Sequence, residues 1–351
     1  MGHYLAKRLL LMIPTLVGIL AITFAVIQFV PGGPVEQMVQ TLTHSGLAGE
    51  TAAAAPSALM RGQAGLSPEE LAELNRLYGF DKPALERFFD MLVSFARFDL
   101  GQSFFHHQSV GALIVDKLPV SMTLGLWTFF LTYLICIPLG VAKAVRDGSR
   151  FDLVTSSAIL VAYAIPGFVL GVLLLVLFGG GSFWQLFPLR GLTSDNWAEL
   201  GPLDKALDYL WHIALPVTAS TVGNLAVMTL LTKNVFLEEI RRQYVYTARA
   251  KGLSENAILY RHVFRNALIP LITGFPAAFI GAFFTGSLLI ETLFSLDGLG
   301  LLSYESVIRR DYPVVMGSLY VFTLLGLVAK LLSDLSYLWV DPRVSFEEGG
   351  R

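Results

Sequence analysis

The chain has 351 residues, of which 54% are hydrophobic and 15% charged, and its mean hydropathy is +0.61. Soluble globular proteins carry about 25% charged residues, so the composition argues against a soluble protein and excludes a disordered one. One cysteine, Cys136, excludes a disulfide-rich secreted domain, and a net charge of −2 gives no support for nucleic-acid binding. The composition therefore predicts a polytopic membrane protein.

Six apolar windows are long enough to cross a bilayer, which takes about 20 residues as a helix. They are Leu9–Val30, Pro119–Ala142, Leu153–Phe178, Trp211–Thr232, Ala267–Ile290 and Val314–Leu338. A transmembrane β-barrel would show strands of alternating polarity, which these windows lack. The sequence predicts an all-α fold with six transmembrane helices. Prolines that kink membrane helices fall within these windows at Pro166, Pro216, Pro270 and Pro276.

The first window follows Lys7 and Arg8, as the apolar region of a signal peptide would. Its 22 residues exceed the roughly 7–15 of such a region, and Pro31-Gly32-Gly33-Pro34 follows in place of a small-residue cleavage site. We therefore expect residues 1–30 to comprise an N-terminal tail and a retained first transmembrane helix.

Residues 31–118 form a predicted extracytoplasmic segment. Within it, 41–66 is rich in Gly, Ala, Ser and Thr and is typical of a linker, and Ser67-Pro68-Glu69-Glu70 predicts a helix start. A second helix after Pro83 would place five apolar residues on one face, namely Leu85, Phe88, Phe89, Leu92 and Phe95. Two interpretations stay open: a helical cap packed on the spans, or a docking surface for a soluble partner.

Lysine and arginine in short loops indicate which side of the membrane is cytoplasmic. The 143–152 loop has three and the 233–266 loop has seven, whereas 179–210 and 291–313 have two each. This asymmetry predicts that both termini are cytoplasmic, with spans 2–6 in residues 119–338 and a C-terminal tail at 339–351.

The 233–266 loop is more ordered than a plain connector. Leu237, Ile240, Tyr244 and Ala248 share a helical face, and Gly252-Leu253-Ser254 would end one helix and cap the next. The pattern predicts two short cytoplasmic helices joined by a tight turn. Positive charge alone would explain the basic residues, but small residues such as Ala248 and Gly252 favour close approach of another surface.

Two groups of polar residues within the spans are candidates for transport. Lys330 and Asp334 are four residues apart on one helical face, and they form either a local pair or a coupling-ion or substrate site. Asn224, Thr229 and Thr285 are candidates for a substrate path, and the simpler interpretation is hydrogen bonding between helices.

The sequence lacks the common catalytic motifs. No His-Glu-x-x-His or Gly-x-Ser-x-Gly is present, and no nucleophile and base pattern supports an intramembrane protease. The dipeptide Gly-Lys does not occur, so the chain has no phosphate-binding P-loop. We expect a protein that is not an enzyme, and any use of ATP would need a separate ATPase subunit.

Several fragments occur together in a specific order. The longest is Tyr244-Val245-Tyr246-Thr247-Ala248-Arg249-Ala250-Lys251-Gly252-Leu253, followed by His262 and by Arg265-Asn266-Ala267-Leu268-Ile269-Pro270. Others are Phe98–Ser103, Ile137–Gly140, Ile165–Phe168, Glu291, Gly298, Gly300, Arg310–Pro313 and Asp341–Arg343. Over nearly its whole length the chain resembles the membrane permease subunits of ATP-binding-cassette importers for peptides, the dipeptide/oligopeptide class.

This resemblance implies a type I importer permease fold in the bacterial inner membrane. It also implies that one loop helix docks on the ATPase, through Tyr244, Thr247, Ala248, Arg249, Ala250, Lys251, Gly252 and Leu253. The implied partners are a second, similar permease subunit, an ABC ATPase with two nucleotide-binding domains, and an extracytoplasmic peptide-binding protein. The chain itself would bind no cofactor, because ATP and Mg²⁺ would lie on the ATPase.

Pro31–Pro34, the long linker before Ser67 and Phe187–Leu192 resemble the Yej-type subgroup, whose systems import oligopeptides and, in some members, the peptide-nucleotide microcin C. The chain departs from the wider class at Tyr246, where many relatives have an acidic residue, and at Phe264 and Arg265, which replace a leucine-proline pair. The alternative function is a self-sufficient secondary transporter of peptides coupled to ions through Lys330 and Asp334.

Overall fold

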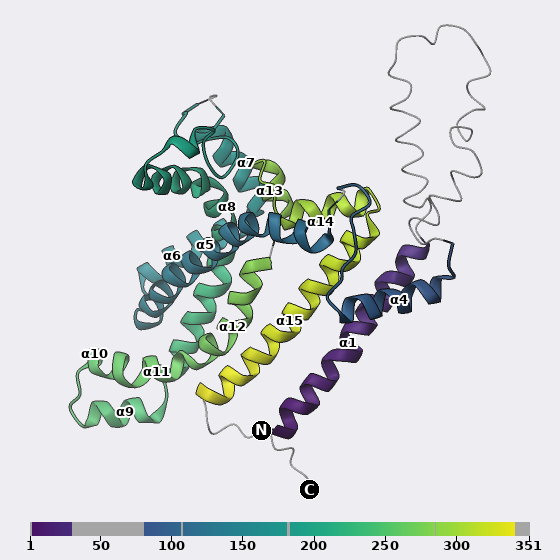
Figure 1. Ribbon diagram of the computed structural model, residues 1–351. Coiled ribbons are helices and arrows are strands. Elements are labelled where there is room, and N and C mark those ends of the chain that lie inside the picture. The colour runs from purple at the N-terminus through teal and green to yellow at the C-terminus, as the bar shows by residue number, and fades with distance from the viewer. Residues whose placement is uncertain (1, 30–80, 107, 181–182, 285, 341–351) are drawn as a thin grey trace. The chain divides into compact units, whose positions relative to one another are not determined.

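The computed structural model describes residues 2–29, 81–106, 108–180, 183–284 and 286–340, with side chains from residue 5 to residue 336 within these ranges (Figure 1). The predicted linker at 41–66, the helix start at Ser67 and the C-terminal tail from residue 341 lie outside the described residues. The chain divides into two compact units, Met1–Asp116 with Leu302–Leu324, and Lys117–Leu301 with Leu325–Arg351.

Helices dominate the part of the chain that the structure describes, which confirms the predicted all-α class. Five segments are long and apolar enough to cross a membrane: Leu5–Phe29, Val110–Val145, Pro202–Ile240, Ile269–Leu293 and Tyr312–Ser336. They correspond to α1 (Gly2–Phe29), α5 (Val110–Val145), α8 (Pro202–Ile240), α12 (Ile269–Phe284) with α13 (Leu288–Leu293), and α15 (Tyr312–Val340).

The predicted third span is bent at Pro166, one of the prolines expected to kink the membrane helices. Residues 150–178 form two helices, α6 (Arg150–Ala164) and α7 (Gly167–Phe178), which meet at 92°. The cause lies at Ile165 and Pro166. Proline disfavours the helical conformation of the residue before it, and Ile165 is extended, with φ −88° and ψ 116°. Among the described residues there are therefore five helices that are long and apolar enough to span a membrane, or six if this bent pair counts as one.

The larger unit is organised around α8, against which both α6 and α7 pack. Between α7 and α8 lies the short 3₁₀-helix η2 (Trp197–Glu199). Apolar residues of α5, α7, α8 and the α13 region form one buried cluster: Leu124, Leu175, Ile213, Leu215, Val217, Ala219, Ile290, Phe294 and Leu296. Burial of these side chains fixes α7 and α13 to the same end of α8.

Helices α5 and α12 approach each other backbone to backbone at Gly125. A Cβ atom on Gly125 would lie 1.7 Å from the carbonyl oxygen of Ala282, so no side chain fits there. A similar approach joins α5 to α8, where a Cβ on Gly140 would lie 2.5 Å from the Cβ of Thr232. Small residues at such points bring membrane helices into close van der Waals contact.

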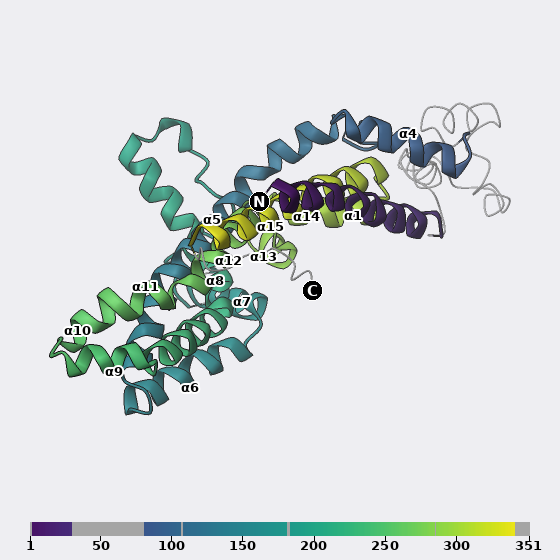
Figure 2. The ribbon, with the colours of Figure 1, turned by 90° about the horizontal axis from the view of Figure 1, so that it is seen from below.

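Between α8 and α12 the chain forms short helical elements, seen beyond the end of α8 in Figures 1 and 2. They are α9 (Gln243–Ala250), α10 (Glu255–Ile258), the π-helical turn η3 (Leu259–Val263) and α11 (Phe264–Ala267). The predicted continuous helix through Leu237 and Ala248 is wrong, because α8 ends at Ile240 and Arg242 is the extended N-cap of α9.

The smaller unit contains α1, α4 (Ala84–Ala96), most of α14 (Leu299–Ile308) and the first half of α15. Its core is formed by Leu20, Phe95, Met316 and Tyr320. Asp311 organises the segment after α4. Its carboxylate accepts hydrogen bonds from Ser103 Oγ at 2.5 Å and from the backbone N–H of Phe104 at 3.1 Å.

Candidate functional site

The turn predicted at Gly252 is built by the backbone. Gly252 has φ +80°, a conformation that glycine adopts without strain. Its N–H donates to the carbonyl of Arg249 at 2.9 Å, and the N–H of Leu253 donates to that of Ala248 at 3.2 Å. These two bonds form a Schellman motif, which ends α9. Ser254 then caps α10, because its Oγ accepts from Ala257 N at 3.3 Å. The predicted turn at Gly252 and the predicted helix start at Ser254 are confirmed.

An ion pair closes the turn from outside. The Nε and Nη2 atoms of Arg249 donate to the two carboxylate oxygens of Glu255 at 2.5 and 2.9 Å. This two-point pairing is the strongest geometry for arginine and a carboxylate. The hydrogen bond from Arg249 holds the pKa of Glu255 below its ordinary value. The pair links the end of α9 to the start of α10 across the turn.

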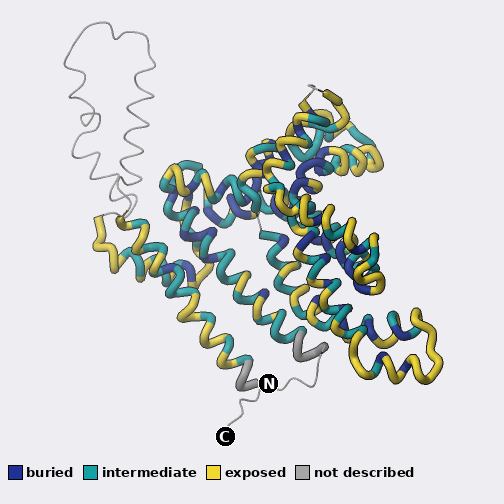
Figure 3. The backbone as a smooth tube through the Cα atoms, turned by 180° about the vertical axis from the view of Figure 1, so that it is seen from behind, coloured by how far each residue is buried: buried dark blue, intermediate teal, exposed yellow. Residues whose placement is uncertain are grey.

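The two faces of α9 have different surroundings. Val245 and Ala248 are buried against Phe236 of α8 and Ile258 of α10. Ala248, which the sequence analysis placed among the docking residues, therefore supports the loop from inside. Tyr244 is half-buried, and burial raises the pKa of its hydroxyl. The remaining predicted residues are exposed, as Figure 3 shows for the outer side of this hairpin: Thr247, Arg249, Ala250, Lys251, Gly252 and Leu253.

A buried charge network lies beside this loop and joins α5, α6 and α8. Lys143 is 0% exposed, and its ammonium lies 3.0 Å from the Asp152 carboxylate. The ammonium also donates to Thr155 Oγ1 and Ser156 Oγ at 2.8 and 2.7 Å. Lys233 of α8 approaches the same carboxylate at 2.7 Å. Every charge in this network therefore has a close partner of opposite sign.

This network was not predicted from the sequence, in which Lys143 and Lys233 were interpreted only as loop charges. Asp152 holds the network together, and its position has a local cause. Ser149 is the N-cap of α6 and accepts from the N–H of Asp152 at 3.2 Å. An acidic residue three positions after a serine cap is favoured at a helix start. A carboxylate at the edge of an apolar window, with lysines nearby, is the signal that could have revealed it.

An open concavity of about 810 Å³ lies among α5, α7, α8 and α12. Of the predicted path residues, Asn224 lines it, and the Asn224 side chain donates to the carbonyl of Ser220 at 3.1 Å. Thr229 is buried away from it, at the close approach of α8 to Gly140 of α5. Thr285 lies outside the described residues. The lining also includes Tyr133, Thr128 and Ser287.

Glu291 of α13 is a buried carboxylate that stabilises one edge of this concavity. It accepts hydrogen bonds from the N–H of Ser287 at 3.1 Å, the N–H of Leu301 at 2.7 Å and the hydroxyl of Ser121 at 3.3 Å. Gly298 packs on it so closely that a Cβ there would lie 2.6 Å from the carboxyl carbon. Glu291 is one of the residues that carry the family resemblance, which assigns it no role. The structure gives it one, since it joins α13 to the start of α14 and to α5.

The other predicted intramembrane pair is loose. Lys330 Nζ lies 3.9 Å from Asp334 Oδ1, and the side chains are 65% and 14% exposed. This separation is longer than a charge-assisted hydrogen bond. The structure thus brings the two residues onto one face of α15, as their spacing predicts.

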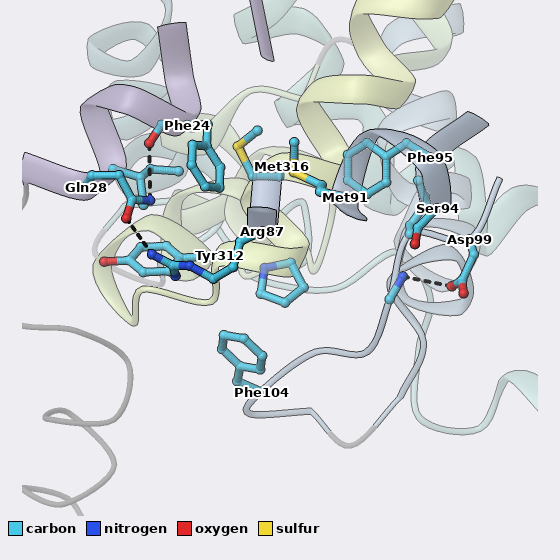
Figure 4. A pocket seen from close by; sticks show the side chains of 14 residues that line it. Phe24, Gln28, Arg87, Met91, Ser94, Phe95, Asp99, Phe104, Tyr312 and Met316 are labelled. Carbon is cyan, nitrogen blue, oxygen red and sulfur yellow. Dashed lines mark hydrogen bonds between the residues drawn. The ribbon is translucent and has the colours of Figure 1, made fainter. Parts of the chain in front are cut away.

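The smaller unit has a separate pocket of about 260 Å³ between α1, α4 and the start of α15 (Figure 4). Figure 4 shows Arg87 reaching Gln28, to which it donates at 2.7 Å, with Tyr312 beside it. The guanidinium lies 5.9 Å from the centre of the Phe24 ring, and burial lowers the pKa of Arg87. Two aromatic and two methionine side chains also line the pocket, namely Phe95, Phe104, Met91 and Met316.

Comparison with known proteins covers almost the entire chain. Residues 136–346 match the family described as binding-protein-dependent transport system inner membrane component. The peptidoglycan transport system permease protein YejB of Agrobacterium fabrum is 55% identical over 360 residues, covering 99% of both chains. The inner membrane ABC transporter permease protein YejB of Escherichia coli O157:H7 is 53% identical, covering 99% of this chain and 100% of its own.

A more distant relative belongs to the same class. The dipeptide transport system permease protein DppB of Escherichia coli K12 is 31% identical over 363 residues, covering 98% of this chain and 99% of its own. The family match begins in α5 and contains the whole 233–266 loop, the bent α6–α7 pair and the α7, α8 and α12 walls of the concavity. The inner membrane relatives and the apolar helices together show that this is a multi-pass inner membrane protein. The chain belongs to the family of inner membrane components of binding-protein-dependent transport systems.

Proposed function

We propose that the chain forms one half of the translocation pathway of an ATP-driven importer for oligopeptides. A second, similar permease subunit forms the other half, and an extracytoplasmic peptide-binding protein delivers the substrate. An ABC ATPase with two nucleotide-binding domains, which binds the ATP and Mg²⁺, docks on the 233–266 loop. Both termini then lie in the cytoplasm. The observation that carries this proposal is the α9 turn, whose outer residues are exposed while Val245 and Ala248 beneath them are buried against α8.

The contacts of α9 explain how the loop transmits movement. Val245 and Ala248 pack against Phe236, so α9 cannot shift without moving the end of α8. Lys233, one turn before Phe236, is tied to Asp152 at the start of α6. A displacement applied to the exposed surface of α9 therefore reaches α5, α6 and α8 together. This is a rigid-body mechanism, in which packed elements move as a unit between states.

The 810 Å³ concavity is the surface that we propose binds the substrate. Its wall combines apolar and small residues with hydroxyl and amide groups such as Ser220, Asn224 and Tyr133. Groups of this kind pair with peptide backbone while leaving side-chain identity open. We place the substrate path along this wall, with Asn224 as a contact and Thr229 as a packing residue.

Two narrower substrate classes follow from the resemblance and the relatives. Microcin C, a peptide-nucleotide, is one. Peptide fragments of peptidoglycan are the other, because a 55% identical relative is named a peptidoglycan transport system permease. The ion-coupled alternative has less support, since Lys330 is 65% exposed and 3.9 Å from Asp334.

The test is reconstitution of the complex that co-purifies with the tagged chain in mild detergent. The proposal expects a second permease and a P-loop ATPase in the purified complex, and peptide uptake into vesicles only with ATP and the binding protein. Competition among an oligopeptide, a peptidoglycan peptide and microcin C ranks the substrates. Lys330→Met should retain ATP-driven uptake. Uptake without ATP that depends on an ion gradient and is lost in Lys330→Met would overturn the proposal.

A further inference from the structure

Helix α4 carries three rows of side chains with different surroundings. Phe88, Leu92 and Phe95 face inward and pack with Leu20 and Tyr320 in the core of the smaller unit. A second row is charged, since Lys82 lies 3.4 Å from Glu86 and 2.6 Å from Asp90. The third row is apolar and exposed: Leu85, Phe89 and Val93 are 74%, 62% and 52% accessible.

The apolar arc of α4 is wider than packing on this unit requires. A helix on a protein surface typically buries a stripe of about 100° and leaves the rest polar. In α4 the inward row fills such a stripe, and Leu85, Phe89 and Val93 add a second stripe beside it at four-residue spacing. Phe98, just after the helix, is also exposed, at 72%. The single apolar face predicted from the sequence is thus two faces, of which one has no burial within this unit.

The location of α4 identifies what covers the exposed row. Phe88 contacts Phe24 of α1, with ring centres 5.2 Å apart, and Arg87 bonds to Gln28 near the end of α1. Figure 1 shows α4 lying across this end of α1. Because α1 is an apolar membrane span, α4 lies at the level where the chain leaves the bilayer. Exposed apolar residues of α1 reach the same level, at Val26 and Phe29.

We infer that α4 is an interfacial membrane helix that binds the lipid surface of the bilayer. Leu85, Phe89 and Val93 enter the boundary between headgroups and acyl chains, while Lys82, Glu86 and Asp90 stay in water. Leucine and phenylalanine on one face with charges on the other is the pattern of helices that lie in this interface. The row contains no polar atom that would need a hydrogen-bond partner, which suits lipid better than a protein surface.

Site-directed spin labelling of the full-length chain in phospholipid vesicles tests this inference. Cys136 is the only cysteine, so Cys136→Ser provides the background. Nitroxide labels at Phe89→Cys and Val93→Cys report on the exposed apolar row. Labels at Asp90→Cys and Glu86→Cys, in the charged row of the same helix, are the matched controls. Val26→Cys on α1 gives the value for a lipid-facing position. Collision of the label with oxygen, which concentrates in lipid, is compared with collision with a water-soluble nickel chelate.

The inference expects a higher ratio of oxygen to nickel collision at 89 and 93 than at 86 and 90, approaching the value at 26. A ratio at 89 and 93 as low as at 90 would show that the row faces water. Low collision with both reagents would show that protein covers it. Either of these results would overturn the assignment, and neither depends on transport activity, so the importer proposal is tested separately.

Discussion

The ammonium of Lys143 and the carboxylate of Asp152 lie 3.0 Å apart, and their side chains are 0% and 5% exposed. They come from opposite ends of the short connection between α5 and α6, and Lys233 of α8 joins them from a distant part of the chain. Burial of three charges is favourable only when each has close partners, because desolvation costs several kcal/mol per ion. The network therefore holds three helix ends in one arrangement.

Asp152→Ala should destabilise the protein strongly, by about 3–5 kcal/mol, because it leaves a buried ammonium without its counter-ion. Lys143→Met should cost less, because Asp152 keeps its ion pair with Lys233. Thermal unfolding of the purified variants in detergent measures both effects. Asp147→Ala is the matched control, since Asp147 is 37% exposed and should change stability by less than about 1 kcal/mol. Equal stability of Asp152→Ala and Asp147→Ala would contradict this view of the network.

The effect of a substitution at Gly252 should depend on how readily the new residue adopts positive φ, and not on the size of its side chain. A Cβ there meets no atom within 4 Å, but φ is +80°. Gly252→Val should distort the turn and abolish ATP-driven uptake, because the left-handed conformation costs a β-branched residue more than the roughly 1–2 kcal/mol of an ordinary residue. Gly252→Asn should keep most of the uptake, since asparagine adopts positive φ more readily. Uptake and ATPase activity of the reconstituted complex are the measurements, and normal uptake with valine is the contrary result.

Charge reversals at Arg249 and Glu255 should compensate each other, because the two side chains form an ion pair. Arg249→Glu and Glu255→Arg each place like charges across the turn, so each should slow ATP-driven uptake while leaving thermal stability within about 1 kcal/mol, as expected for an exposed pair. Combining the two restores an opposite-charge pair and should recover uptake. If the double variant stays inactive, Arg249 contacts the ATPase directly and its pairing with Glu255 is secondary.

Glu291→Gln should destabilise the α13 region. The carboxylate accepts from two backbone N–H groups and a hydroxyl, whereas an amide brings a donor of its own and leaves one of them unsatisfied, at a cost of about 1–3 kcal/mol. Gly298→Ala should have a similar effect, because the added methyl group would overlap the carboxylate. Thr292→Ala, at an exposed neighbouring position, is the control for thermal unfolding. A glutamine variant as stable as this control would show that the buried charge is dispensable.

The sequence predicts the elements whose signals are local. The turn at Gly252 and the cap at Ser254 follow from the preferences of glycine and serine, and hydropathy finds the apolar segments. The site of the bend at Pro166 also follows from the sequence, but its size, 92°, does not. Contacts between distant residues were not predictable. The ion pair between Asp152 and Lys233 and the hydrogen bond from Leu301 to Glu291 depend on how the helices pack. The spacing of residues within one segment does not predict this packing.

The same limit applies to the site residues. Ala248 and Thr229 are small or polar residues at positions where the sequence allows either exposure or burial. Both are buried, because α9 and α8 each turn that face toward a neighbouring helix. Asn224, in the same helix as Thr229, faces the concavity instead. The two positions are five residues apart in α8. The packing of α5 against α8 determines that Thr229 is buried and that Asn224 lines the concavity.

The contact at Gly125 limits how this membrane domain can change shape. Because the backbone of α12 occupies the place of a side chain there, sliding α12 along α5 would bring the Ala282 backbone against a position of α5 that carries a side chain. Rotation about the contact carries no such penalty. Any cycle of opening and closing must therefore turn these two helices around Gly125 as a fixed point, so that small angular changes there become larger displacements at their far ends.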